Sequence, residues 1–132
     1  MKNGLVINNI GNKIWYKDDK IHREDGPAIE FSNGSKSWYK DNKLHREDGP
    51  AIEYSNGDKF WFQNGKYHRL NEPAIEYKSG SKIWYQNGKY HRLDGPAIEL
   101  GSGYKSWYYK GEEIECSSQE EFEIFLNFKA FL

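Results

Sequence analysis

The residues best suited to chemistry are a histidine, an arginine and an aspartate that recur together. His-Arg-Glu-Asp stands at residues 22–25 and 45–48, and related segments begin at His68 and His91. A histidine beside an aspartate can act as a general acid or base. An active site is normally built once, however, whereas this segment occurs in four successive copies. We therefore interpret it as a structural ladder, expect no catalytic residue and predict that the chain is not an enzyme.

The arginine of each copy has acidic residues close to it in the sequence. We expect Arg46 or Arg69 to bind the aspartate of its own turn, with Glu53 or Glu76 near enough to assist. These pairs would order the segment that ends at each proline. The histidine of each copy is predicted to pack in the sheet opposite a tryptophan.

The same histidines are poor candidates for a metal site. Neighbouring copies should advance by about two strand spacings, roughly 10 Å, whereas zinc ligands lie about 2 Å from the metal. Cys116 is the only cysteine, so no internal disulfide can form, and we expect it to be buried near the start of a terminal helix. Glycine loops for phosphate and nucleophile motifs are absent from the sequence. We expect neither a metal nor a cofactor.

These residues belong to a repeat with a period of 23 residues, which means stacked supersecondary units. Pro-Ala-Ile-Glu recurs at the same period. The residues assigned to the structural ladder are Trp15, Trp38, Trp61, Trp84, Trp107, His22, His45, His68 and His91.

Each unit carries two turn signals, which are clearest at Asn56-Gly57 and Asn64-Gly65. Asn-Gly favours a two-residue type I′ hairpin loop. The predicted strands therefore run over residues 50–55, 58–63 and 66–69. If both loops contain two residues, Ile52 lies opposite Trp61 and Tyr54 opposite Lys59, while Phe62 lies opposite Tyr67. One face would then hold Ile52, Tyr54, Trp61 and His68, and the other Ala51, Glu53, Phe60, Phe62, Tyr67 and Arg69.

The predicted fold class is an all-β repeat: an elongated, twisted antiparallel sheet of stacked 23-residue β-hairpin units with a C-terminal capping α-helix. We interpret residues 1–132 as a single domain, with an N-terminal half-unit over 1–11, repeats over 12–116 and the cap over 117–132. Ser118 and Glu121 form a capping-box pattern, so the helix is expected over residues 119–131. Its apolar side should be Phe122, Phe125, Leu126 and Phe128, folded over the open end of the sheet.

Charge and composition limit the partners. The formal net charge is −1, and acidic and basic residues are interspersed in every unit. Binding to nucleic acid or to an acidic membrane surface usually needs a basic excess, so we expect neither. The N-terminal residues lack the apolar run of a signal peptide, and no stretch is long enough to span a membrane. The expected location is the cytoplasm.

The 23-residue period and the Asn-Gly-Lys-Tyr-His-Arg segments at residues 64–69 and 87–92 resemble MORN repeats. Arginine follows the histidine where MORN units place glycine, so the chain is most similar to the divergent variant of bacterial antitoxin-like proteins and of phage and giant-virus reading frames. The resemblance implies a row of β-hairpins that binds a partner and does not catalyse. It also implies a phage-encoded inhibitor or antitoxin acting in the host cytoplasm.

Positions that vary between units indicate where a partner binds. One position becomes apolar only in the middle of the array, where it reads Ser37, Phe60, Ile83 and Ser106. A second position on the same face reads Ile21, Leu44, Tyr67 and Tyr90. The predicted aromatic patch therefore consists of Phe60, Phe62, Tyr67, Ile83, Tyr85 and Tyr90, flanked by Arg69 and Arg92. An exposed patch of this kind marks a protein-binding surface. Alternatively, the terminal helix or a second copy of the chain covers it, or it is core.

The leading hypothesis is a non-enzymatic protein-binding module that uses this patch. The alternative is a small-ligand binder, in which Trp, Tyr, His and Arg stack a nucleobase and hold its phosphate. A third is an assembly role as a homo-oligomer, because an open sheet edge can pair with another chain. Residues 70–72 depart from the repeat, through drift or because that corner is shaped for contact.

Overall fold

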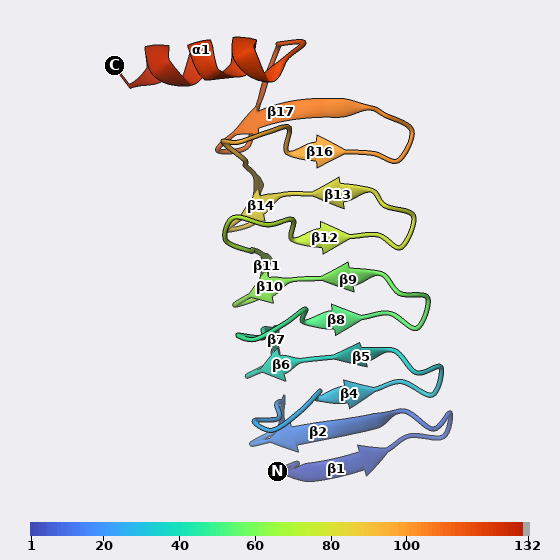
Figure 1. The fold of residues 1–132 in the computed structure, drawn as a ribbon. Coiled ribbons are helices and arrows are strands. Elements are labelled where there is room, and N and C mark those ends of the chain that lie inside the picture. The colour runs from blue at the N-terminus through green and yellow to red at the C-terminus, as the bar shows by residue number, and fades with distance from the viewer. Residues whose placement is uncertain (131–132) are drawn as a thin grey trace.

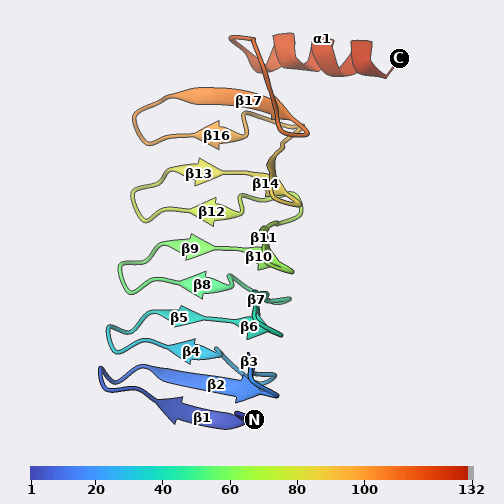
Figure 2. The same ribbon diagram turned by 180° about the vertical axis from the view of Figure 1, so that it is seen from behind.

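The chain forms an elongated stack of antiparallel β-hairpins with a helix at its C-terminal end, as predicted (Figure 1). The structure is a computed structural model and describes residues 1–130. Successive units lie one above the other, so that the N-terminus and the helix stand at opposite ends of the array (Figures 1 and 2). Among the described residues, no helix combines the length and the apolar composition needed to cross a bilayer.

The main feature is a twelve-stranded antiparallel sheet within the described residues, to which each unit contributes two short strands. Its strands are β1 (Gly4–Ile7), β2 (Lys13–Lys17), β3 (Lys20–Ile21), β4 (Ile29–Glu30), β5 (Lys36–Ser37), β8 (Ile52–Glu53), β9 (Lys59–Phe60), β12 (Ile75–Glu76), β13 (Lys82–Ile83), β16 (Ile98–Glu99), β17 (Lys105–Tyr109) and β18 (Glu112–Ile114). Separate two-stranded hairpins are β6 (Tyr39–Lys40) with β7 (Lys43–Leu44), β10 (Phe62–Gln63) with β11 (Lys66–Tyr67), and β14 (Tyr85–Gln86) with β15 (Lys89–Tyr90).

The hairpin turn that follows each tryptophan has the type I′ geometry predicted for it. In the third unit, Asn64 has φ 50° and Gly65 has φ 80°, and the two residues connect the predicted pair Phe62 and Tyr67. Equivalent residues in the other units also have positive φ, including Asp18 and Asp19 at the start of the array. Short polar side chains and glycine tolerate this backbone region, which explains why they recur at these positions.

The register predicted for the other hairpin is wrong by one residue. The loop that follows Tyr54 contains three residues and not two, because the Tyr54 N–H donates to the Asp58 carbonyl and only Gly57 has a positive φ (102°). Asn56 instead accepts a hydrogen bond from the Asp58 N–H through its side chain. Ile52 therefore pairs with Phe60 and not with Trp61. The extra loop residue exchanges the faces of the strand pair.

The exchange moves several residues to the face opposite the one predicted. Ile52 and Tyr54 join the face of Phe60, and the Tyr54 and Phe60 ring centroids lie 5.1 Å apart. Glu53 pairs with Lys59 on the other face. The predicted long strand over residues 58–63 also divides at Trp61, between β9 and β10.

Besides larger side chains such as Phe62 and Trp84, the core contains small residues in repeated positions. Ala28, Ala51, Ala74 and Ala97, one from each Pro-Ala-Ile-Glu segment, are completely buried. The alanine carbonyl accepts from the N–H of the preceding tryptophan, as Ala51 does from Trp38 at 2.7 Å. Backbone approach at this point explains why a small side chain recurs there.

Helix α1 (Gln119–Lys129) covers the C-terminal end of the array. Ser118 caps it, because its Oγ accepts from the Glu121 N–H at 3.2 Å, while the Glu121 carboxylate accepts from Ser117. Phe122 is completely buried, and the Trp107 indole N–H donates to Gln119. Phe128, predicted on the apolar side, is 66% exposed instead. Phe131, the expected last helical residue, lies outside the described residues.

Candidate functional site

Each corner, meaning the segment from His-Arg to Pro (residues 22–27, 45–50, 68–73 and 91–96), is organised by its arginine. In the second corner, the Arg46 guanidinium carbon lies 3.8 Å from the centre of the Trp38 ring. Its Nε donates to Asp48 at 3.1 Å, and its Nη1 donates to the Pro50 carbonyl at 3.1 Å and reaches Glu53 at 3.5 Å. The pairing predicted for Arg46 is thus confirmed. The indole ring of Trp38 therefore contacts the face of the guanidinium, while Asp48 and the Pro50 carbonyl bind its N–H groups.

The other corners repeat this arrangement with one change. Arg23, Arg69 and Arg92 lie 3.7–3.8 Å from the ring centres of the tryptophans of their own units. In the third corner, the pair of Arg69 with an aspartate is absent, because Asn71 (φ 61°) stands where the other corners have aspartate. Glu72 binds Arg69 at 2.9 Å instead. Glu72 stands where the other corners have glycine, so this corner keeps its arginine pair by a different backbone path.

The histidines link each unit to the next through the hairpin turns. Nδ1 of His45 accepts from the Asn64 N–H at 3.0 Å, and the equivalent atoms of His22, His68 and His91 accept from the turns that follow them. Because Nδ1 is an acceptor, the neutral ring carries its proton on Nε2. In the second unit Nε2 lies 2.6 Å from Glu47. Each ring therefore bridges two units.

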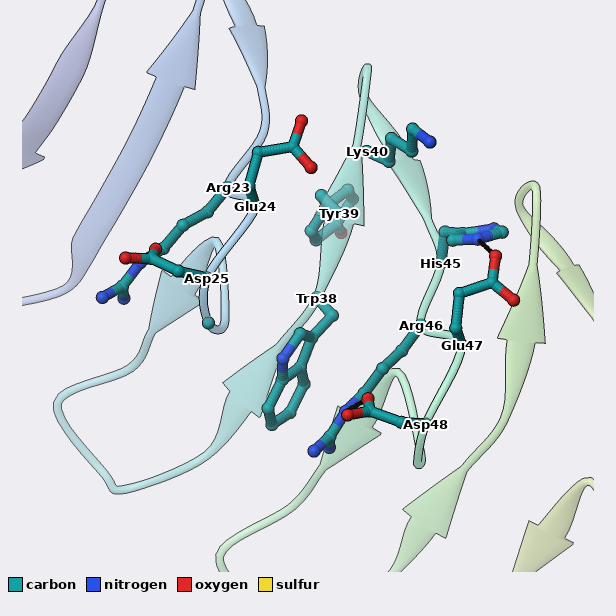
Figure 3. Close-up of a pocket in the computed structure, with 11 residues that line it drawn as sticks. Arg23, Glu24, Asp25, Trp38, Tyr39, Lys40, His45, Arg46, Glu47 and Asp48 are labelled. Atoms are coloured by element: carbon teal, nitrogen blue, oxygen red, sulfur yellow. Dashed lines mark hydrogen bonds and ion pairs between the residues drawn. The ribbon is translucent and has the colours of Figure 1, made fainter.

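Grooves lie between consecutive corners along one side of the array. The first has a volume of about 540 Å³ and is lined by Trp38 and by the charged residues of the first two corners (Figure 3). The second and third, of about 750 and 300 Å³, repeat this arrangement at Trp61 and Trp84. Figure 3 shows Trp38 between Asp25 of one corner and Arg46 of the next. Both signs of charge line the first groove, which suits a mixed polar and aromatic ligand.

The aromatic patch lies on the opposite side of the strands from the tryptophans. Its rings form an unbroken series: Phe62 lies 4.2 Å from Tyr67, Tyr67 lies 4.8 Å from Tyr85, and Tyr85 lies 4.6 Å from Tyr90, between ring centroids. Phe60 joins the series at 6.0 Å from Tyr67. Phe62 is 7% exposed and the other rings are half-buried. The rings therefore cover one another's faces and leave their edges accessible.

Burial changes the acidity of this patch. It raises the pKa of Tyr67, and it raises the pKa of Tyr85 further, with the adjoining Tyr90 as an additional cause. Helix α1 does not lie on the patch within the described residues: it packs at the end of the array, where Phe125 meets Tyr109 at 5.9 Å (Figure 2). The alternative in which this helix covers the patch is therefore not what the structure shows.

Two residues expected to flank the patch lie elsewhere. Arg69 and Arg92 stack on tryptophans on the groove side, because strand alternation places Trp61 and Trp84 opposite the patch. Ile83 pairs with Ile75 and Ile98 in the large sheet. Three rings that extend the series were missed: Tyr54 at 5.1 Å and Tyr77 at 5.8 Å from Phe60, and Tyr108 at 4.8 Å from Tyr90. Tyr54 and Tyr77 are 23 residues apart, which could have identified them.

The side chains that could bind a metal do not cluster in the described part of the chain. Within residues 1–130, no three His, Cys, Asp or Glu side chains gather as metal ligands would. Cys116 is half-buried and not fully buried as expected, and burial raises the pKa of its thiol, which makes the thiol less reactive.

No protein-family model matches the sequence, and no curated protein is significantly similar to it.

Proposed function

We propose that this chain is a non-enzymatic binding protein that docks on a protein partner through the aromatic patch. The observation that carries the proposal is the unbroken series of rings from Phe60 to Tyr90, which no other described element covers. Tyrosine and phenylalanine are enriched at the energetic centres of protein interfaces. Their exposed edges and the tyrosine hydroxyls would supply both apolar contact and hydrogen bonds.

Rigidity supports the same role. The rings are fixed by their neighbours, and hydrogen bonds between successive hairpins, such as Gly88 N–H to the Tyr67 carbonyl at 2.8 Å, hold the units in register. A surface that is already ordered loses less conformational entropy on binding. The MORN-like resemblance adds the proposed biological role: an inhibitor or antitoxin that acts in the cytoplasm by occupying a surface of its partner.

The repeat itself supplies substitutions that remove the rings and preserve the fold. Tyr67 and Tyr90 occupy the position held by Ile21 and Leu44 in the first two units, so Tyr67→Leu with Tyr90→Leu should fold normally. We expect this double variant to weaken the captured partner's binding by about tenfold or more, measured with the purified partner after affinity capture.

The matched control changes two exposed residues away from the patch. Leu70 is 67% exposed and Leu93 is 51% exposed, and both lie on the corners. Replacing both with alanine should leave partner binding unchanged. Undiminished binding by the Tyr67→Leu, Tyr90→Leu variant would exclude the aromatic patch.

The grooves favour one alternative function, the binding of small nucleotide-like ligands. Ligand sites are usually concave, and each groove combines an indole ring with a guanidinium, groups that can stack a base. The arginines are already paired with carboxylates, which leaves less capacity for a phosphate. A thermal-shift screen with nucleotides tests this: saturable stabilisation that Trp61→Leu removes would support the alternative.

A further inference from the structure

Strand β1 forms one edge of the large sheet and lacks a neighbour that its equivalents have. The Pro-Ala-Ile-Glu strands β4, β8, β12 and β16 each pair with a strand on both sides, whereas β1, at the same place in the repeat, pairs with β2 alone within residues 1–130. All its residues are exposed, among them Leu5 at 47%, Val6 at 39% and Ile7 at 59%. Figure 1 shows no other element beside this edge.

The backbone of β1 is ready to pair outward at two positions. Trp15, which lies opposite Leu5, donates its N–H to Ala28 and accepts from His22, so its backbone faces away from β1. Leu5 therefore occupies a non-hydrogen-bonded position, and its own N–H and C=O point out of the sheet. Ile7, two residues on, points the same way. An apolar edge with free donors and acceptors readily pairs with another strand.

The side chains of β1 indicate what kind of strand fits there. Ile7 stands at the repeat position that holds glutamate in every other unit, and each of those glutamates pairs with a lysine on the neighbouring strands, as Glu53 does with Lys36 and Lys59. Ile7 already lies opposite Lys13 of β2 and carries no charge, so a lysine on the strand at its other side would have no carboxylate to pair with. The missing neighbour is therefore expected to be apolar, which β1 itself is.

A row of paired side chains in the sheet also ends at β1. Ile14 pairs with Val6 on one side and with Ile29 on the other, and the row continues through Ile52 and Ile75 along the array. A second β1 placed antiparallel would continue this row from Val6 into another copy of the chain.

The opposite edge is protected, which makes the two ends of the array unequal. Strand β18 there carries Glu112 and Glu113, and helix α1 lies beyond β17 (Figure 1). Short, charged edge strands resist pairing. We propose that two copies of this chain associate through β1, antiparallel and two-fold symmetric about Val6, to form one continuous sheet. Leu5 then pairs with Ile7 of the partner, and each of these residues donates and accepts a hydrogen bond.

The test compares two glutamate substitutions that each restore a residue of the repeat. Ile7→Glu places a carboxylate opposite Lys13, as in the other units, so the monomer should remain folded. The same change puts a charge against Leu5 of the second copy. Leu70→Glu is the control, because Glu24 and Glu47 hold that exposed position in the first two units.

Sedimentation equilibrium should show the wild-type full chain approaching twice its monomer mass with rising concentration. We expect Ile7→Glu to raise the dimer dissociation constant by about tenfold or more, and Leu70→Glu to leave it unchanged. The register is checked with Val6→Cys in a Cys116→Ser background. Non-hydrogen-bonded partners have Cα atoms about 4.5 Å apart, within the range of a disulfide, so mild oxidation should link the two copies.

A wild-type protein that remains monomeric at every concentration would overturn the proposal. So would a dimer that Ile7→Glu does not weaken, because it would have to use another surface. A dimer weakened by Ile7→Glu that fails to crosslink through residue 6 would contradict the proposed register.

Discussion

The corner glycines allow a graded test of how the arginines stabilise the stack. A Cβ atom added at Gly95 would stand 2.5 Å from the Arg92 guanidinium carbon, at Gly49 2.8 Å from that of Arg46, and at Gly26 3.1 Å from that of Arg23. Contacts below about 3.0 Å force a displacement. Alanine should therefore destabilise the fold least at Gly26, more at Gly49 and most at Gly95.

The size of the effect follows from what Arg92 would lose. Its guanidinium lies 3.7 Å from the centre of the Trp84 ring, a cation–π contact of about 0.5–2 kcal/mol. It also donates to the Pro96 carbonyl at 3.1 Å, and hydrogen bonds of charged groups contribute about 1.5–3 kcal/mol. The pair with Asp94 adds little, because that carboxylate is exposed. Partial loss of these contacts predicts about 1–3 kcal/mol for Gly95→Ala, and less than about 1 kcal/mol for Gly26→Ala, whose Cβ contact can be relieved by a small shift.

Urea unfolding followed by tryptophan fluorescence measures these differences, and a double-mutant cycle assigns the cause. Removing the guanidinium removes the clash, so Gly95→Ala should cost nothing further in an Arg92→Ala background. In that background we expect a small gain in stability, because Gly→Ala reduces the entropy of the unfolded chain at compatible positions. An equal loss of stability with and without Arg92 would refute the reasoning and point to the backbone itself.

Three further outcomes follow from the titrating groups and the helix cap. Burial and the neighbouring Lys110 lower the pKa of His91, so on acidification the histidine is protonated at a higher pH in the unfolded chain than in the folded one. The free energy of unfolding should therefore fall as the pH drops below about 6.5. In urea unfolding, His91→Gln should weaken this pH dependence. Burial raises the pKa of Tyr85, so its stabilising contribution should be full below about pH 10 and decline above it; Tyr85→Phe should remove a late step from the alkaline absorbance titration. Ser118→Ala should cost about 1 kcal/mol in urea unfolding, because the Glu121 N–H loses its cap, whereas Ser118→Asp should retain most of the stability.

The overall architecture was predictable because the same turn and strand signals recur in every unit of the repeat. Positive φ at both residues of the Asn64-Gly65 turn follows from their types, and the pairing of Phe62 with Tyr67 follows from that turn. The capping Ser118 and the helix start at Gln119 also follow from local sequence. These features depend on contacts within a few residues, where residue type strongly limits the backbone.

The faces of the large sheet were not predictable from turn residues alone. Asn56-Gly57 has the same letters as Asn64-Gly65, yet Asn56 uses its side chain to accept from Asp58, and the loop gains a residue. Both loop types are common for Asn-Gly, and the choice depends on how the flanking strands pack on neighbouring units. That single residue decides whether Ile52 lies beside Phe60 or Trp61.

The role of the histidines was underestimated for a related reason. A packed ring opposite a tryptophan was expected, but Nδ1 of His45 reaches a backbone N–H 19 residues away, in the turn of the next unit. Sequence spacing cannot show this contact, because it depends on how far one unit is displaced from the next. The same displacement places the stem of Lys43 3.7 Å from where a Cβ at Gly65 would stand, so the contact between hairpins is close.

Side chains at repeated positions have their binding partners within the chain, whereas some side chains at variable positions have surface left for an outside partner. The Arg46 guanidinium has Trp38, Asp48 and a backbone carbonyl around it, so little of its binding capacity is left for a partner, and the same holds in each unit. Tyr67 and Tyr90 pack against the Tyr85 ring at 4.8 and 4.6 Å between centroids, and the first two units have aliphatic residues at that position. Stability of the stack therefore does not require aromatic rings there. Because replacing an aliphatic residue with tyrosine in two adjacent units leaves the architecture unchanged, a requirement from outside the chain is the better explanation for the rings, and the binding of the Tyr67→Leu, Tyr90→Leu variant decides it.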